Sequence, residues 1–316
     1  MDAVILSAGY GKRLLPITRF YQKAVLGVYG IPPLLYQIYN LKQKGIKQFF
    51  INMHHGKDTL KKLLAAFLPP DGDTAVNLIE ENEILGTGGA LVNLRKLLSD
   101  DFLVINGDSY LDIDLDSFYR FFKQSGCVSA LMLGDRENRN ISGIGMKAGL
   151  INCIDIRKQA KLPYMFYGCH LINRKIFDIC SRSGYADIIT DIYSTLIKER
   201  LLAGYGVKKP LFDIGTFSNI REGLRDLTGS SFEVINLKDF CTYDPKGNSL
   251  YFNTCPDTSP ERIINSTLSF DVRVSKKARI KNSVIMQNNY IGPEERISES
   301  VVPPGFFSSC LCSEQR

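Results

Sequence analysis

The first 220 residues alternate short apolar runs with amphipathic segments, and this alternation constrains the fold more than any other feature. The pattern is typical of a β-sheet covered by helices. Apolar runs predict strands at 3–8, 48–53, 76–80, 102–106 and 128–133. Apolar residues at helical spacing predict helices at 33–44, 57–67, 89–99 and 115–125. The sequence therefore predicts an α/β fold with a doubly wound, mostly parallel sheet.

Composition narrows the class of protein. The chain has 316 residues, 44% of them hydrophobic and 23% charged, which suits a globular enzyme with one large domain and one smaller one. Its 39 basic and 33 acidic residues are spread out, so we expect no nucleic-acid partner. No run approaches the roughly 20 apolar residues of a membrane span, and no charged leader precedes an apolar run. We expect a cytoplasmic protein with no membrane partner.

Cysteine and histidine residues do not predict a metal centre. The eight cysteines lack paired CxxC spacing, so we expect buried or free thiols. Cys310 and Cys312 are close enough in sequence to bind a metal or oxidise, but free thiols are the favoured interpretation. The three histidines, His54, His55 and His170, are expected to pack rather than to form a cluster.

The stretch LSAGYGKRLLPIT, residues 6–18, follows the first predicted strand. Ligands of doubly wound sheets bind beyond the carboxyl ends of the strands. Gly9 and Gly11 would let phosphate oxygens approach the backbone, and Lys12, Arg13 and Lys23 would supply positive charge. A plain βα turn is the alternative, because the loop lacks the third glycine of a dinucleotide motif and the ending of a P-loop.

Residues 6–34 resemble the signature of the sugar-1-phosphate nucleotidyltransferases, commonly LAAGxGTRLxPLT, then PKPLLPV, then GxPLL. Lys23 falls on the signature lysine, and Gly30, Pro32 and Leu34 fall on the last motif. The likeness continues in residues 51–55, 80–91, 106–115 and 212–216. The resemblance implies a Rossmann-like fold and a reaction between a nucleoside triphosphate and a sugar 1-phosphate.

The resemblance also implies the catalytic groups. An oxygen of the sugar 1-phosphate attacks the α-phosphorus in line, and pyrophosphate leaves without a covalent protein intermediate. Arg13 would neutralise the leaving pyrophosphate, and Lys23 would bridge the phosphates of both substrates. Asp108 would be catalytic and would hold Mg²⁺ together with Asp213. Two carboxylates with phosphate oxygens make a typical hard-cation site.

Substrate recognition is implied by the same resemblance. The nucleotide-binding residues would be Leu6, Ala8, Gly9, Gly11, Glu81, Gly86, Thr87 and Gly88. A carboxylate at Glu81 suits the N–H donors of guanine, although related uridylyl enzymes can carry an acid there too. Gly168 falls on the sugar-side glycine, and Lys158 is the candidate sugar-phosphate lysine.

The chain departs from the family pattern around its phosphate lysine. The usual PKP is Gln22-Lys23-Ala24, and the usual threonine before the arginine is Lys12. Loss of two prolines frees the backbone and is expected to loosen the aim of Lys23. This departure raises the alternative of a regulatory, non-catalytic paralogue that binds sugar nucleotides.

Beyond residue 262 a repeat with a spacing of 17 begins, in NSTL (265–268), NSVI (282–285) and ESVV (299–302). Within each unit an aliphatic residue recurs every six positions: Leu268, Val274, Ile280, then Ile285, Ile291, Ile297. This period predicts a short left-handed hexapeptide β-helix, with an irregular tail as the alternative. So short a prism needs a partner, either the catalytic domain or, in a homo-oligomer, another subunit's β-helix.

The expected organisation is a nucleotidyltransferase catalytic domain at 1–227, a connector at 228–262, the β-helix at 263–304 and a tail at 305–316. We expect a Mg²⁺-dependent enzyme that makes GDP-mannose or a close relative. A uridylyl or thymidylyl enzyme, including one acting on N-acetylmuramate 1-phosphate, is the alternative within the same class.

Overall fold

The computed structural model describes residues 1–316 except 30, 69–72, 137–140, 180–183, 209–210, 227–240, 245, 253–261 and 307–316. Most of the expected connector 228–262 and most of the expected tail 305–316 lie outside the described residues. Gly30, Cys310 and Cys312 lie outside them too.

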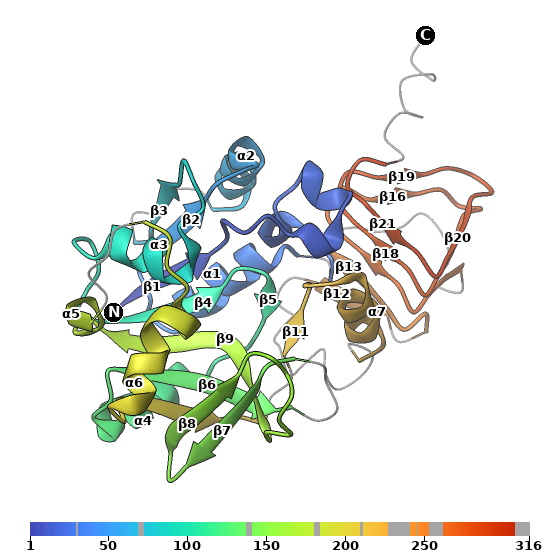
Figure 1. Ribbon diagram of the computed structural model, residues 1–316. Coiled ribbons are helices and arrows are strands. Elements are labelled where there is room, and N and C mark those ends of the chain that lie inside the picture. Colours follow the sequence, from blue (N-terminus) through green and yellow to red (C-terminus); the bar gives the residue numbers. More distant parts are fainter. Residues whose placement is uncertain are drawn as a thin grey trace.

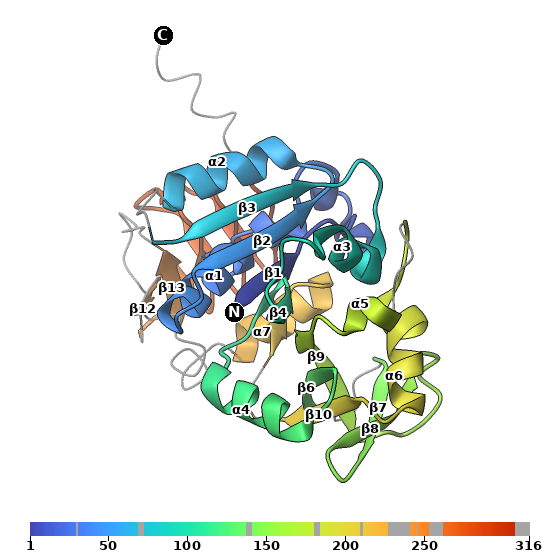
Figure 2. The ribbon, with the colours of Figure 1, turned by 90° about the vertical axis from the view of Figure 1, so that its left-hand side faces the viewer.

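A nine-stranded sheet forms the centre of the N-terminal part, in the order β3-β2-β1-β4-β9-β6-β10-β8-β7. Its strands are β1 (Asp2–Leu6), β2 (Gln48–Met53), β3 (Ala75–Glu80), β4 (Asp101–Asn106), β6 (Ser129–Asp135), β7 (Gly143–Lys147), β8 (Leu150–Asp155), β9 (Tyr164–Asn173) and β10 (Leu202–Gly206). The first four in space are parallel, and Figure 2 shows β1, β2 and β3 side by side. The five predicted strands are confirmed.

The other half of the sheet is mixed. Strand β9 runs antiparallel to both β4 and β6, and β7 and β8 are an antiparallel pair. The expectation of a mostly parallel sheet is therefore wrong for this half. The reason is the short connections that lead from β6 through β7 and β8 to β9, because a parallel pair needs a long crossover.

Helices cover both faces of the sheet (Figure 1). They are α1 (Pro33–Gln43), α2 (Lys57–Phe67), α3 (Gly86–Leu94), α4 (Leu115–Ser125), α5 (Ile176–Ile179), α6 (Ser194–Lys198) and α7 (Phe217–Asp226), with a π-helical turn at Ile188–Tyr193. Ala3 and Ile5 of β1 pack in one core cluster with α1, α2 and α4. Val4, on the other face, packs with α3 and α6. The double winding is thus observed, and α3 begins at Gly86 rather than at residue 89.

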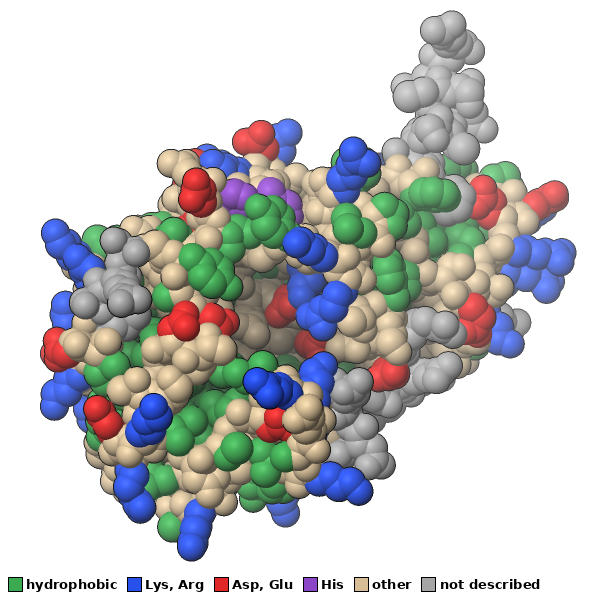
Figure 3. Space-filling view, viewed as in Figure 1, with side chains coloured by type: hydrophobic (Ala, Val, Ile, Leu, Met, Phe, Trp, Pro, Cys, Tyr) green, Lys and Arg blue, Asp and Glu red, His purple; other side chains and the backbone are tan. Residues whose placement is uncertain are grey.

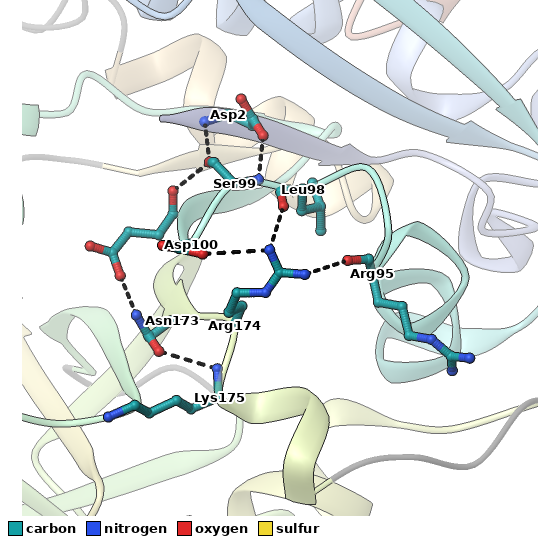
Figure 4. A network of polar contacts seen from close by, with 9 residues as sticks. Asp2, Arg95, Leu98, Ser99, Asp100, Asn173, Arg174 and Lys175 are labelled. Atoms are coloured by element: carbon teal, nitrogen blue, oxygen red, sulfur yellow. Dashed lines mark hydrogen bonds and ion pairs between the residues drawn. The ribbon is translucent and has the colours of Figure 1, made fainter.

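A network of polar contacts fixes the carboxyl end of α3 (Figure 4). The guanidinium of Arg174, just after β9, donates to the carbonyl of Arg95 at 3.3 Å and to that of Leu98 at 3.5 Å. The carboxylate of Asp2 accepts from the backbone N–H of Ser99 at 2.7 Å. A cation is favourable at the carboxyl end of a helix. These contacts fix the position of α3 relative to β1. Because a helix is rigid, its first turn, at the other end, is then held at the carboxyl edge of the parallel strands.

Three short sheets form the C-terminal part, and they are parallel except for the antiparallel pairing of its first two strands. Their strands are β12 (Cys241–Asp244), β13 (Ser249–Phe252), β14 (Ile263–Ile264), β15 (Thr267–Leu268), β16 (Arg273–Val274), β17 (Arg279–Lys281), β18 (Val284–Ile285), β19 (Tyr290–Ile291), β20 (Arg296–Ser298) and β21 (Val301–Val302). Ile263 pairs with Ile280, and Ile280 with Ile297, so neighbouring strands in the sheet are one 17-residue repeat apart. The six aliphatic residues predicted to point inward are buried in one cluster.

The C-terminal sheets pack against the N-terminal part of the same chain (Figure 1). Val284 and Met286 are buried in the core cluster that contains Val25 and Val28. Of the two partners considered from the sequence, the structure therefore shows the first. Among the described residues, no helix has the length and apolar composition to cross a bilayer.

We predict an acid-sensitive contribution from His170 on β9, which is buried and hydrogen-bonded to the hydroxyl of Tyr193. Burial lowers the pKa of His170 from 6.5 to about 3. Between these values the unfolded chain binds a proton that the folded chain does not. The stability from this group is therefore fully present above pH 6.5 and is lost as the pH falls.

Urea unfolding at several pH values tests this. Over about pH 6.5 to 5, the free energy of unfolding of the natural chain should fall by up to about 1.4 kcal/mol per pH unit more than that of His170→Gln. Identical pH dependence in the two proteins would contradict the assignment.

Candidate active site

A pocket of about 250 Å³ opens at the carboxyl edge of the parallel strands. Of the predicted site residues, it is lined by Leu6, Ala8, Gly9, Gly11, Lys23, Glu81, Gly86, Thr87 and Asp108. They come from the segments that follow β1, β3 and β4 and from the Lys23 turn. Figure 3 shows a hollow in the middle of this face with charged side chains around it. This edge is where α/β sheets bind ligands.

Polar residues at the strand ends also line the pocket, although they were not predicted from the sequence. The Asn52 amide donates to Glu81 Oε1 at 2.8 Å, and its oxygen accepts from the Ser7 N–H at 2.8 Å. Ser7 returns a hydrogen bond from its hydroxyl to the Asn52 carbonyl at 2.7 Å. Asn106, at the end of β4, lines the pocket as well. The signal in the sequence was a polar residue directly closing each apolar run.

Glu81 is fixed by its own hydrogen bonds. It is 3% exposed, its Oε1 accepts from Asn52, and its Oε2 accepts from the Leu85 N–H at 3.1 Å. A carboxylate has about four acceptor positions, so further N–H donors can still be bound. The Glu81 carboxylate is thus a hydrogen-bond acceptor with a fixed orientation, on the side of the pocket formed by β3 and α3.

Lys23 and Asp108 form an ion pair in the pocket. Lys23 begins a 3₁₀ turn, Lys23–Val25, and Asp108 follows β4. The two side chains are 15% and 25% exposed. The pair places an ammonium group and a carboxylate next to each other beside the glycine loop, so charges of both signs face a ligand there.

Asp213 reaches this site through a second, two-stranded sheet. Strand β11 (Phe212–Asp213) pairs with β5 (Ser109–Tyr110), and the N–H of Ile214 donates to the Asp108 carbonyl at 3.0 Å. Asp213 Oδ1 accepts from the Gly215 N–H and from the Asn219 amide, both at 2.7 Å. Asp213 thus lies on β11, and Asp108 directly precedes the strand that pairs with it, although Asp213 does not line the pocket itself.

Arg13 lies beside Asp213 rather than in the pocket lining. A Cβ placed on Gly215 would be 2.5 Å from Asp213 Oδ1 and 3.2 Å from Arg13 Nη2. Each of the two side chains thus has an atom close to Gly215. Arg13 belongs to the 3₁₀ turn Lys12–Leu14, directly after the glycine loop. The structure brings Arg13, Lys23, Asp108 and Asp213 to one end of the sheet.

Besides Arg13 and Asp213, three further predicted residues lie outside the pocket lining. Gly88 donates its N–H to the Ala186 carbonyl at 2.8 Å and packs α3 against that segment. Gly168 has a φ of +70°, and a Cβ there would be 2.5 Å from the Asn106 amide nitrogen. Lys158 is exposed, in a turn after β8, with a φ of +59°. Their substrate roles stay predictions.

The two glycines of the loop differ in their structural demands. Gly11 has a φ of +62°, and a Cβ there would be 2.8 Å from Thr18 Cγ2. A Cβ on Gly9 would meet no atom within 4 Å. The fold itself therefore requires glycine at position 11, whereas from the sequence this glycine was expected to serve ligand approach. Gly9, by contrast, keeps open space over the pocket.

Comparison with known proteins identifies the family. Residues 2–230 match the family described as nucleotidyl transferase. The chain belongs to this family. A bifunctional protein GlmU from Methanococcus aeolicus is 27% identical over 337 residues, which cover 98% of this chain and 79% of that protein. The mannose-1-phosphate guanylyltransferase catalytic subunit beta of Danio rerio is 26% identical, with coverage of 83% and 68%.

Another relative and a solved structure are also similar to this chain. For the bifunctional protein GlmU of Methanocaldococcus jannaschii, the match spans about half of that relative, 51%, at 26% identity. Among solved structures, HddC from Yersinia pseudotuberculosis superposes with a TM-score of 0.61 at 22% identity, covering 72% of this chain and 99% of that one. The superposition shows that this chain and HddC share the α/β fold.

We predict that alanine at Gly11 affects stability, whereas alanine at Gly9 affects ligand binding. Gly11→Ala should lower stability by about 1–2 kcal/mol, because an L residue is strained at positive φ. Gly9→Ala should leave the melting temperature of the free chain nearly unchanged but reduce the shift caused by nucleoside triphosphate, because its Cβ fills space over the pocket.

Thermal unfolding with and without nucleoside triphosphate measures both effects. A Gly9→Ala chain that keeps the full ligand-induced shift would show that phosphate binds elsewhere.

Proposed function

We propose that the chain condenses a nucleoside triphosphate with a sugar 1-phosphate to give a nucleotide sugar and pyrophosphate. The observation that carries this proposal is the Lys23–Asp108 pair at the carboxyl edge of β1 and β4, with Asp213 on the strand paired beside it. Cations and carboxylates gathered next to a glycine loop suit a polyphosphate substrate. Family membership supports a transferase enzyme.

The proposed reaction is a direct displacement at phosphorus. An oxygen of the sugar 1-phosphate forms a bond to the α-phosphorus, and the bond from that phosphorus to the β-phosphate oxygen breaks. Pyrophosphate leaves with the electron pair. Lys23 neutralises phosphate charge on both substrates, and Arg13 neutralises the leaving group. Positioning and charge stabilisation carry such reactions, and a protein nucleophile is not required.

The residues also fit a Mg²⁺ ion, which we propose as the cofactor. Asp108 uses Oδ2 toward Lys23, and Asp213 uses Oδ1 toward Gly215 and Asn219. Each keeps its other carboxylate oxygen, a ligand that Mg²⁺ prefers. In the described part of the chain, no three His, Cys, Asp or Glu side chains gather into a metal site, so substrate phosphate oxygens would complete the shell. Bound Mg²⁺ supplies charge neutralisation at the α-phosphate.

For the substrate we propose a guanine nucleotide and a hexose 1-phosphate such as mannose 1-phosphate. The fixed acceptor Glu81 suits the N–H donors of guanine, and a relative named mannose-1-phosphate guanylyltransferase supports the choice. Gly168 and Lys158 are the proposed sugar-side residues. A uridylyl or thymidylyl specificity is the competing outcome of the experiment below. The substrates fit the expected cytoplasmic location.

We further propose that residues 263–304 are a short left-handed β-helix, joined to a catalytic domain at 1–227. Strands in register at each repeat and one buried aliphatic cluster support the β-helix. Assembly into a homo-oligomer through this part stays a prediction.

Pyrophosphate release across four nucleoside triphosphates and several sugar 1-phosphates tests the proposed function. We expect release in the presence of Mg²⁺, strongest with GTP and mannose 1-phosphate. Strong pyrophosphate release only with UTP or dTTP would show a uridylyl or thymidylyl specificity instead of the proposed guanylyl one. No pyrophosphate release in any combination would favour a non-catalytic paralogue.

We also predict that Lys23→Ala lowers turnover by roughly 100-fold or more, as the loss of one well-placed donor to a transition state typically does. Lys12→Ala is the matched control, because the Lys12 ammonium lies 5.7 Å from the centre of the Tyr10 ring and does not line the pocket. It should change turnover little. Equal losses in the two variants would mean that Lys23 is not the phosphate lysine.

A further inference from the structure

A buried glutamine of the C-terminal sheets binds the backbone just after Lys23. Gln287 follows β18 and is 4% exposed. Its Nε2 donates to the Val25 carbonyl at 3.0 Å, and its Oε1 accepts from the Gly27 N–H at 3.1 Å. A neighbouring strand in a parallel ladder would bond the same two groups around Leu26. The side-chain amide therefore takes the place of a strand.

Two more side chains of the C-terminal sheets contact this segment. The Thr267 hydroxyl donates to the Val28 carbonyl at 2.7 Å. A Cβ on Gly27 would overlap the Ser269 hydroxyl, so only glycine permits the close approach. Val25, Leu26 and Val28 are each at most 1% exposed. Water cannot replace these hydrogen bonds, because the segment is buried.

The segment held in this way is continuous with the Lys23 turn. The N–H of Leu26 donates to the Lys23 carbonyl at 3.1 Å, and that of Val25 to the Gln22 carbonyl at 3.2 Å. Before the lysine, the fully buried Gln22 donates its amide to the His55 carbonyl. Lys23 is thus fixed between two glutamine amides, one on each side. The sequence analysis expected a loosened lysine where the two prolines are missing, and these amides supply the restraint instead.

We propose that Gln287 is a positioning residue for Lys23: it holds the 25–27 backbone so that the Lys23 ammonium faces the pocket and the substrate phosphates. The proposal rests on the proposed function for the role of Lys23. Gln287 does not line the pocket, so it acts through the backbone and not on the substrate. On this account the C-terminal repeat is a working part of the active site.

A double-mutant cycle tests the proposal. Gln287→Met keeps the length and burial of the side chain but removes both hydrogen bonds. We expect it to lower kcat by about 10- to 100-fold, because small misplacements of a catalytic group cost that much. In a Lys23→Ala background it should cost almost nothing more, because the lysine to be positioned is gone. Equal losses in both backgrounds would show a general structural role and overturn the proposal.

The matched control is Ser283→Ala. Ser283 is buried in the same C-terminal sheets, where its hydroxyl donates to the Lys281 carbonyl at 2.7 Å and accepts from the Ser300 N–H at 3.2 Å. It should leave kcat unchanged even where it lowers the melting temperature. A loss of kcat as large as that of Gln287→Met would contradict specific positioning.

Hydrogen–deuterium exchange of the 22–28 backbone separates this proposal from the proposed function, because it needs no turnover. Gln287→Met should speed exchange at Gly27 at least 10-fold relative to both the natural chain and Ser283→Ala. Unchanged exchange overturns the proposal even in an active enzyme. A natural chain that releases no pyrophosphate would refute the proposed function, while faster exchange would still support the restraint by Gln287.

Discussion

The site depends on the parallel pairing of β1 with β4 in the middle of the sheet. Leu6 aligns with Asn106, and the N–H of Gly107 donates to the Leu6 carbonyl at 2.9 Å. Because the two strands end together, the glycine loop after β1 and Asp108 after β4 must share one edge. The β5–β11 pair then adds Asp213 next to Asp108. The two carboxylates of the proposed site are therefore placed by these backbone alignments.

Local patterns predicted the residues that lie next to strand ends. Gly9 and Asp108 follow apolar runs that are strands in the structure, so the fold itself brings them to the pocket. The placement of Arg13 and Asp213 near each other, both beside Gly215, depends on the pairing of two strands of only two residues each. These strands are far apart in the chain, so their pairing leaves no local pattern. The antiparallel pairings in one half of the sheet were missed because strand direction depends on connections, not on apolar content. The early start of α3 was missed because glycines usually weaken a helix, while here they let Ala186 approach closely.

In the C-terminal repeat, too, the local structure could be predicted from the sequence, whereas a contact between distant residues could not. Its period predicted which aliphatic residues turn inward, because one buried side chain per short strand is a local requirement. The contact with residues 25–28 could not be predicted, because Gln287 and Gly27 are 260 positions apart. Leaving a buried backbone group without a partner costs about 1–3 kcal/mol. Moving the C-terminal sheets away would leave the backbone groups of Val25 and Gly27 unpaired, so this cost fixes the position of the sheets beside the Lys23 turn. In this way the repeat contributes to the chemistry proposed for the site.

The central claim is that the pocket between the β1 loop, the Lys23 turn and Asp108 holds the triphosphate. The most direct test is a crystal structure of the full chain with Mg²⁺ and a non-hydrolysable nucleoside triphosphate. The account predicts the phosphates along the backbone at Gly9, with the α-phosphate between the Lys23 ammonium and the carboxylates of Asp108 and Asp213. A triphosphate bound elsewhere on the molecule, with Lys23 still paired to Asp108 in the open pocket, would contradict it.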